Sequence, residues 1–158
     1  LKPANILFSD DETVKITDFG LSKIVEGDTS AIELTSQGTG TFKYSAPETF
    51  QRGKSVFITK SVDTWSLGII MYEMLYGSSQ PFLDPEHYSQ INFISNTKIS
   101  KQGINFITKC LEKDPTKRPD LSILATDDEY IHPVLVELNL WKMFLFLVVI
   151  IILINHRV

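Results

Sequence analysis

Residues 62–76 read VDTWSLGIIMYEMLY, and this stretch predicts the central helix of the fold. Apolar side chains fall on almost every side of it, which is typical of a helix buried inside a globular domain. At roughly 15 residues it is shorter than the roughly 20 that cross a membrane. Gly77 follows as a stop signal, and Asp63 in the first turn suits the positive end of the helix dipole. We expect the rest of the chain to pack around this helix.

Upstream, a β-hairpin is expected near the start of the chain. The apolar run 6–8 and the alternating run 13–17 flank a polar turn. The alternation puts Leu7, Val14 and Ile16 on one buried face.

The second strand of this hairpin leads into Asp18, Phe19 and Gly20, where we expect a sharp turn. A carboxylate at such a strand end suits Mg²⁺, which takes one or two carboxylates plus phosphate oxygens. An ordinary strand exit capped by Asp and Gly would use the same residue types. These three residues alone leave both readings open.

Further along, residues 21–42 are rich in Ser, Thr and Gly and have no lasting helical or strand period. They predict a surface loop of about twenty residues, a length that is usually functional or mobile. After it we expect a short helix at 44–50, a weaker helix at 87–94, a helix at 101–111, a turn at 113–119 and a short helix at 120–125.

Composition excludes some classes of function. The chain has 158 residues, 43% of them hydrophobic, which fits one domain with its own core. A formal net charge of −4 gives no basic excess, so we expect no direct nucleic-acid binding. The one cysteine, Cys110, excludes an internal disulfide and fits an intracellular, reducing compartment.

The C-terminal stretch 138–158 differs sharply in composition from the rest. Its run 143–154 is entirely apolar and would extend about 18 Å as a helix, against a hydrocarbon core of about 30 Å. Three readings stay open: a strained membrane anchor through 141–154, an added strand or sticky helix, and read-through sequence without function. Membrane contact is a minority alternative among them.

Several motifs, in order and at matching spacing, resemble the second half of a serine/threonine protein kinase domain. They are Leu1-Lys2-Pro3-Ala4-Asn5, Asp18-Phe19-Gly20, Ala46-Pro47-Glu48, DTWSLG at 63–68, and Arg118. The resemblance implies a mainly α C-terminal lobe over residues 1–137, with a short β-hairpin near the active-site edge, followed by the separate apolar tail 138–158.

The resemblance also implies roles for individual residues. Asp18 and Asn5 would be ligands of Mg²⁺ bound with ATP, and Lys2 would stabilise charge on the γ-phosphate. Thr41 would contact the catalytic loop and line the site for the residue after the target hydroxyl. The Lys2-Pro3-x-Asn5 form implies a protein substrate with Ser or Thr.

Other matching residues would be structural. Glu48 and Arg118 would form a buried ion pair, and Asp63 would accept hydrogen bonds from the catalytic-loop backbone. Residues 18–48 would be the activation segment, which begins with Phe19 and Gly20 as structural residues. Its candidate phosphorylation sites are Thr29, Ser30, Thr35, Ser36 and Thr39.

A narrower similarity is to the Tousled-like kinase branch. It rests on 21–24, 34–41, the long spacer 52–60, and 75–77 with Pro81-Phe82. That branch implies a nuclear setting, histone-chaperone substrates and self-association through a coiled coil, for which this chain has no heptads. Ala46 departs from the Pro usual in that branch.

The catalytic Asp of the family would stand immediately before Leu1, and the glycine-rich loop, strand lysine and its glutamate partner would lie further upstream. We therefore expect a fragment that begins inside the catalytic loop and does not catalyse phosphoryl transfer alone. The competing hypothesis is a non-catalytic docking module, membrane-tethered through 141–154 in one version.

Overall fold

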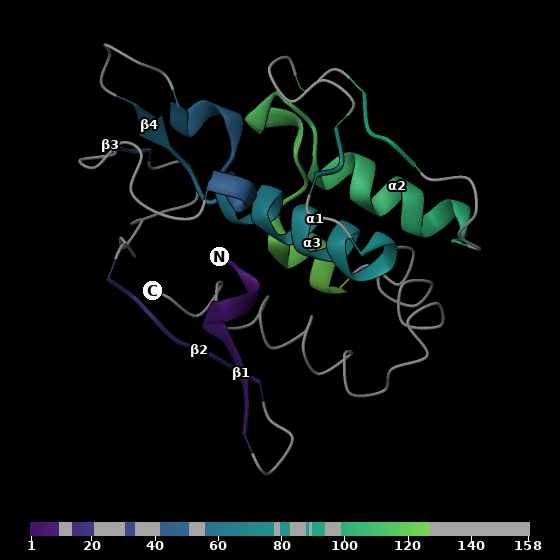
Figure 1. The fold of residues 1–158 in the computed structure, drawn as a ribbon. Helices are drawn as coiled ribbons and strands as arrows, with labels where there is room; N and C mark the ends of the chain where they lie inside the picture. Colours follow the sequence, from purple (N-terminus) through teal and green to yellow (C-terminus); the bar gives the residue numbers. More distant parts are fainter. Residues whose placement is uncertain are drawn as a thin grey trace.

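The computed structural model describes residues 1–9, 14–20, 31–33, 42–50, 56–77, 80–82, 88, 90–93 and 99–126. This described part is helix-rich and contains two small antiparallel sheets, each of two strands. Figure 1 shows helix α1 (Ser61–Tyr76) in the middle, with α2 (Lys101–Cys110) alongside it and the β1–β2 hairpin below. The prediction of a mainly α fold with a short hairpin is confirmed at this level.

Helix α1 is the core of the molecule, as its sequence predicted. Every residue from Thr64 to Tyr72 is buried, so the helix is enclosed on all sides along its middle. It ends at Gly77, whose φ of 70° lies in the left-handed region that favours glycine, and whose N–H donates to the carbonyl of Glu73 at 2.7 Å.

Helices α1 and α2 approach closely at Gly68. A Cβ added there would lie 2.7 Å from Cβ of Cys110 and 2.8 Å from Cδ2 of Leu111, so the contact leaves no room for a side chain. Helix α2 begins at Ser100, whose hydroxyl accepts from the N–H of Gly103 at 3.0 Å. The shared core consists of Ala46, Trp65, Leu67, Ile69, Met71, Tyr72, Phe106, Ile107, Cys110, Leu111, Leu121 and Leu124.

The hairpin forms as predicted, from β1 (Ile6–Phe8) and β2 (Val14–Ile16). The prediction that Leu7 lies on its buried face is wrong. Ile6 pairs with Ile16, and Leu7 pairs with Lys15. Ile6 is buried against α1, where it contacts Ile70, whereas Leu7 is 49% exposed. Because neighbouring residues of a strand face opposite ways, the inward Ile6 turns Leu7 outward.

The predicted loop over 21–42 is wrong at one place. Strand β3 (Ile32–Glu33) pairs antiparallel with β4 (Phe57–Ile58), which lies within the long spacer 52–60. Two-residue strands carry too little alternation to be recognised locally, and this pair forms between distant segments. The predicted helix at 44–50 is two 3₁₀ turns, η2 (Phe42–Tyr44) and η3 (Pro47–Phe50).

The weaker helix predicted over 87–94 is also wrong for its described residues. Tyr88 has a φ of 52°, and Ile91 forms an antiparallel bridge with Phe82. The N–H of Asn92 donates to the carbonyl of Pro81 at 2.5 Å, which joins the two extended segments. These backbone interactions replace the intrahelical ones that a helix would need.

The remaining predicted elements are present with small shifts of their ends. The turn at 113–119 contains the 3₁₀ turn η4 (Pro115–Lys117), and the short helix after it is α3 (Leu121–Thr126). No helix among the described residues has the length and apolarity that a membrane span requires. The predicted tail 138–158, including 141–154, lies outside the described residues.

Candidate functional site

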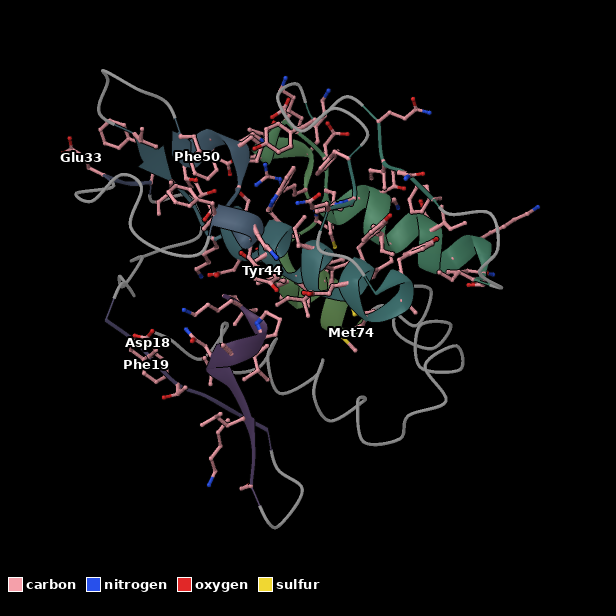
Figure 2. The ribbon with its side chains drawn as sticks, in the orientation of Figure 1. Asp18, Phe19, Glu33, Tyr44, Phe50 and Met74 are labelled. Atoms are coloured by element: carbon pink, nitrogen blue, oxygen red, sulfur yellow. The ribbon has the colours of Figure 1, made fainter. Side chains whose placement is uncertain are left out.

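The two ends of the hairpin bring Asn5 and Asp18 to one edge of the fold. A 3₁₀ turn, η1 (Pro3–Asn5), precedes β1, and the N–H of Thr17 donates to the carbonyl of Asn5 at 2.9 Å. This bond holds the backbone just before Asp18 against Asn5. Figure 2 shows Asp18 and Phe19 at the outer side of the hairpin, apart from the packed helices.

The backbone of Asp18 has an unusual conformation. Its φ of 61° lies in the left-handed region, which non-glycine residues enter rarely and Asp more readily than most. The N–H of Gly20 approaches Oδ1 of Asp18 at 3.4 Å, and the Asp18 side chain is exposed. Phe19 is 53% exposed. Residues in this region cluster at functional sites, and Asp also adopts it in turns.

Lys2 lies at the start of the same edge. Its carbonyl accepts the N–H of Asn5 at 3.0 Å, which closes the η1 turn. The side chains of Lys2 and Asn5 make no hydrogen bond or ion pair with any other described residue. The edge therefore carries one exposed carboxylate and, from two partly buried residues, one amide and one ammonium group.

This set of donors fits a Mg²⁺ ion that also binds phosphate. Mg²⁺ prefers oxygen ligands and commonly takes one or two carboxylates from the protein, with phosphates and waters completing its shell. Within the described ranges, no cluster of three or more His, Cys, Asp or Glu side chains forms a self-sufficient metal site. Asp18 and Asn5 suit an ion that they would share with phosphate oxygens.

Asp63 connects this edge to the central helix. Its Oδ1 lies 3.7 Å from the main-chain nitrogen of Leu1, and Leu1 also packs with Ile6 and Ile70. The carboxylate stands in the first turn of α1, where the helix dipole favours negative charge. The segment that carries Lys2 and Asn5 thus begins beside the first turn of α1.

On the other side of α1, Arg118 and Glu48 form a buried, two-pronged ion pair. Nη1 and Nη2 of Arg118 donate to Oε1 and Oε2 of Glu48 at 2.7 and 2.8 Å. The Arg118 side chain is 0% exposed and that of Glu48 is 11% exposed. This geometry is the one that guanidinium and carboxylate groups match best.

The remaining N–H groups of the Arg118 guanidinium donate hydrogen bonds to backbone carbonyls. Nε donates to the carbonyl of Glu112 at 2.7 Å, Nη1 to that of Ser61 at 3.1 Å, and Nη2 to that of Lys113 at 3.2 Å. Its carbon Cζ lies 4.9 Å from the ring centroid of Trp65, a cation–π contact. One side chain therefore joins η3, the start of α1 and the segment after α2.

Sequence reasoning missed a second polar link, between Tyr44 and Glu73. The Tyr44 hydroxyl donates to Oε2 of Glu73 at 2.6 Å, and the Ser66 hydroxyl donates to the Tyr44 carbonyl at 2.8 Å. Burial and the hydrogen bond to Glu73 raise the pKa of Tyr44 to about 12. The one available signal was Glu73 itself, an acid in the otherwise apolar second half of α1.

Part of the expected site lies outside the residues that the structure describes. Thr41 and the candidate phosphorylation sites lie outside the described residues, and they stay predictions: Thr29, Ser30, Thr35, Ser36 and Thr39.

Comparison with known proteins matches residues 1–130 to the family model described as "Protein kinase domain". The chain is 38% identical over 142 residues to the serine/threonine-protein kinase TOUSLED of Arabidopsis thaliana, covering 80% of this chain and 20% of the relative. It is 40% identical over 143 residues to tousled-like 1 of Caenorhabditis elegans, covering 79% and 15%. For human tousled-like 1 the values are 38% over 151 residues, 84% and 20%. The chain thus spans a fifth or less of these relatives' length.

Proposed function

Because this chain belongs to the protein kinase domain family and is similar to Tousled-type kinases, we propose that it supplies the C-terminal lobe of a serine/threonine protein kinase. The reaction would transfer the γ-phosphate of ATP to a Ser or Thr of a protein substrate. Support comes from the family match together with relatives that carry the name serine/threonine-protein kinase.

The observation that carries this proposal is the edge formed by Asn5 and Asp18. Asp18 and Asn5 would hold Mg²⁺, which when bound neutralises charge on the phosphate oxygens of ATP. The Lys2 ammonium would face the γ-phosphate and stabilise the negative charge that develops there. Among the described residues, the side chains of these three groups have no partner that would have to be displaced, except for the long contact from Gly20 to Asp18.

The supporting contacts fit the same proposal. Asp63 would position residues 1–5, and the ion pair of Glu48 with Arg118 would anchor the end of an activation segment over 18–48. Pre-organised groups of this kind lower the barrier because they need no rearrangement during the reaction. Phosphoryl transfer asks a protein mainly for such positioning and charge stabilisation.

On the substrate side, Thr41 would line the site for the residue after the target hydroxyl. Phosphorylation of the 18–48 segment would regulate access, since a phosphate adds charge and strong acceptors to a loop. A nuclear setting follows from the similarity to the Tousled branch and remains part of the proposal.

The decisive experiment compares Asp18→Asn with wild type in the full-length polypeptide that carries this sequence. Radiolabelled phosphate transfer from Mg-ATP to a protein substrate should fall by at least about a hundredfold, because a charge-stabilising group is lost. Asp120→Asn is the matched control: Asp120 is an exposed acid that caps α3 by accepting the N–H of Ser122 at 2.7 Å, and Asn caps equally well.

Near-normal transfer by Asp18→Asn would refute the metal assignment. If wild-type protein transfers no phosphate at all, while still binding protein partners, the competing hypothesis of a non-catalytic docking module replaces this one.

A further inference from the structure

Lys43 is an exposed cation on the segment that the proposed function places beside the protein substrate. It belongs to the 3₁₀ turn η2, which the N–H of Ser45 closes by donating to the carbonyl of Phe42 at 3.2 Å. Among the described residues, the Lys43 ammonium has no hydrogen-bond or ion-pair partner. In this part of the molecule, its positive charge is therefore available to a group that binds from outside.

The two carboxylates that take part in contacts of the 42–50 segment have partners inside the fold. Glu48, the other charged residue of 42–50, forms the buried ion pair with Arg118. Glu73 of α1 accepts the Tyr44 hydroxyl at 2.6 Å. Neither carboxylate pairs with Lys43, so the segment presents one uncompensated positive charge.

The segment 1–5 has the same sign of charge. Lys2 is its one charged side chain, and the exposed residues Pro3 and Ala4 carry none. The Asp18 carboxylate is the group that would hold Mg²⁺ under the proposed function, so with the ion bound it would not attract a cationic substrate. An acidic peptide is the ligand whose charge complements both segments.

The backbone of Lys43 is held on both sides. The Phe42 ring stacks on that of Phe50, with the ring centroids 5.8 Å apart and an interplanar angle of 26°. The Tyr44 carbonyl accepts from the Ser66 hydroxyl of α1 at 2.8 Å. Because both neighbours are fixed, the Lys43 side chain extends from a defined point, and its charge can favour particular positions of a bound peptide.

We propose that Lys43 is a specificity-determining residue, which selects protein substrates with Asp or Glu at one of the three positions after the target Ser or Thr. The inference rests on the proposed function, in which Thr41 lines the site for the residue after the target hydroxyl. Consecutive Cα atoms are about 3.8 Å apart, so those of Thr41 and Lys43 are separated by at most about 7.6 Å. On its flexible four-carbon side chain, the Lys43 ammonium can thus reach the residues that follow the target hydroxyl.

The kinetic test uses Lys43→Gln and Lys43→Glu in the full-length polypeptide that carries this sequence. Its substrates are peptides that differ only in having Glu or Lys at the first, second or third position after the target Ser. At one of these positions, the wild-type kcat/KM should be roughly fivefold higher for the Glu peptide, the upper end for an exposed ion pair. Lys43→Gln should abolish this preference and Lys43→Glu should reverse it, and salt at about 0.5 M should weaken it in the wild type.

Lys101→Glu is the matched control. Lys101 is also an exposed lysine, at the first residue of α2 and outside both segments, and its substitution changes the net charge by the same amount. This variant should keep the wild-type preference, and a reversal there would overturn the proposal because net charge alone would explain the effect. An unchanged preference in Lys43→Glu would overturn it too. So would an equal loss of kcat/KM for the Glu and Lys peptides, because Lys43 would then affect the fold and not the selection.

Peptide binding, followed by fluorescence anisotropy on the same proteins, separates this inference from the proposed function. If wild type transfers no phosphate but binds a Glu peptide more tightly than its Lys counterpart, and Lys43→Glu reverses that order, the selection by Lys43 stands and the proposed function fails. If wild type transfers phosphate equally well to the Glu and Lys peptides at all three positions, the proposed function stands and the selection is wrong. A wild type that neither binds nor phosphorylates any of the peptides would overturn both.

Discussion

Two polar regions next to α1 differ in burial: the Arg118 ion pair is buried, and the hairpin edge with Asp18 is exposed. On the side of α1 away from the hairpin, the Arg118 side chain is fully buried and all of its N–H groups donate hydrogen bonds. It joins three segments of the chain and contacts the ring of Trp65. At the hairpin edge, Asp18 is exposed, makes one long contact among the described residues and has a φ of 61° in the left-handed region. The first place holds a buried ion pair whose disruption is costly, and the second holds the groups of the proposed chemistry. Substitutions of Arg118 should therefore lower the free energy of unfolding, whereas substitutions of Asp18 should mainly lower phosphoryl transfer.

The largest effect on folding is expected for Arg118→Ala. It would leave the Glu48 carboxylate without its partner in a site that is 11% exposed and would free three backbone carbonyls. Breaking a buried ion pair by removing one partner costs about 3–5 kcal/mol, so the free energy of unfolding in urea should fall by that amount.

Lys117→Ala is the control for that prediction. The Lys117 ammonium lies 3.9 Å from Oδ2 of Asp114 in an exposed pair, and such pairs contribute about 0–1 kcal/mol. Equal losses for the two variants would mean that the buried network does not carry the stability assigned to it.

A smaller effect is expected where α1 meets α2. In Gly68→Ala the new Cβ would lie 2.7 Å from Cβ of Cys110, so the helices would have to separate, at a cost of about 1–3 kcal/mol. Gly77→Ala meets no atom within 4 Å and is strained only by its φ of 70°, which costs about 1 kcal/mol. Thermal unfolding of the two variants checks this order; a larger loss at Gly77 would contradict close packing at Gly68.

The elements that the sequence predicted well are those with a local signal. Helix α1 was readable from its apolar run, and the hairpin from its alternation around a polar turn. Leu7 was placed on the wrong face because the choice between Leu7 and Ile6 depends on which one reaches Ile70 on a distant helix. The β3–β4 pair was missed for the same reason, since its partners come from segments that carry no local strand period.

The site was readable only in part. Asn5, Asp18, Glu48 and Arg118 could be singled out because their order resembles a known family, and the structure contains the contact between the last two. The hydrogen bond from Tyr44 to Glu73 joins residues 29 apart in sequence, and neither residue type predicts it. The left-handed backbone of Asp18 was equally hidden, because a strand pattern predicts that a residue leaves a strand but not the φ it adopts.

The smallest expected effect tests whether that backbone is strained. Glycine adopts a φ of 61° freely, whereas a Cβ in the left-handed region costs about 1–2 kcal/mol, partly offset by the greater freedom of unfolded glycine. Asp18→Gly should therefore be more stable than Asp18→Ala by about 0.5–1 kcal/mol, measured by urea unfolding with EDTA present. The wild type should fall between them, since Asp tolerates this region better than Ala. If Asp18→Ala were the more stable variant, the backbone of Asp18 would not be strained. The contrast between the buried Arg118 ion pair and a strained hairpin edge would then be wrong.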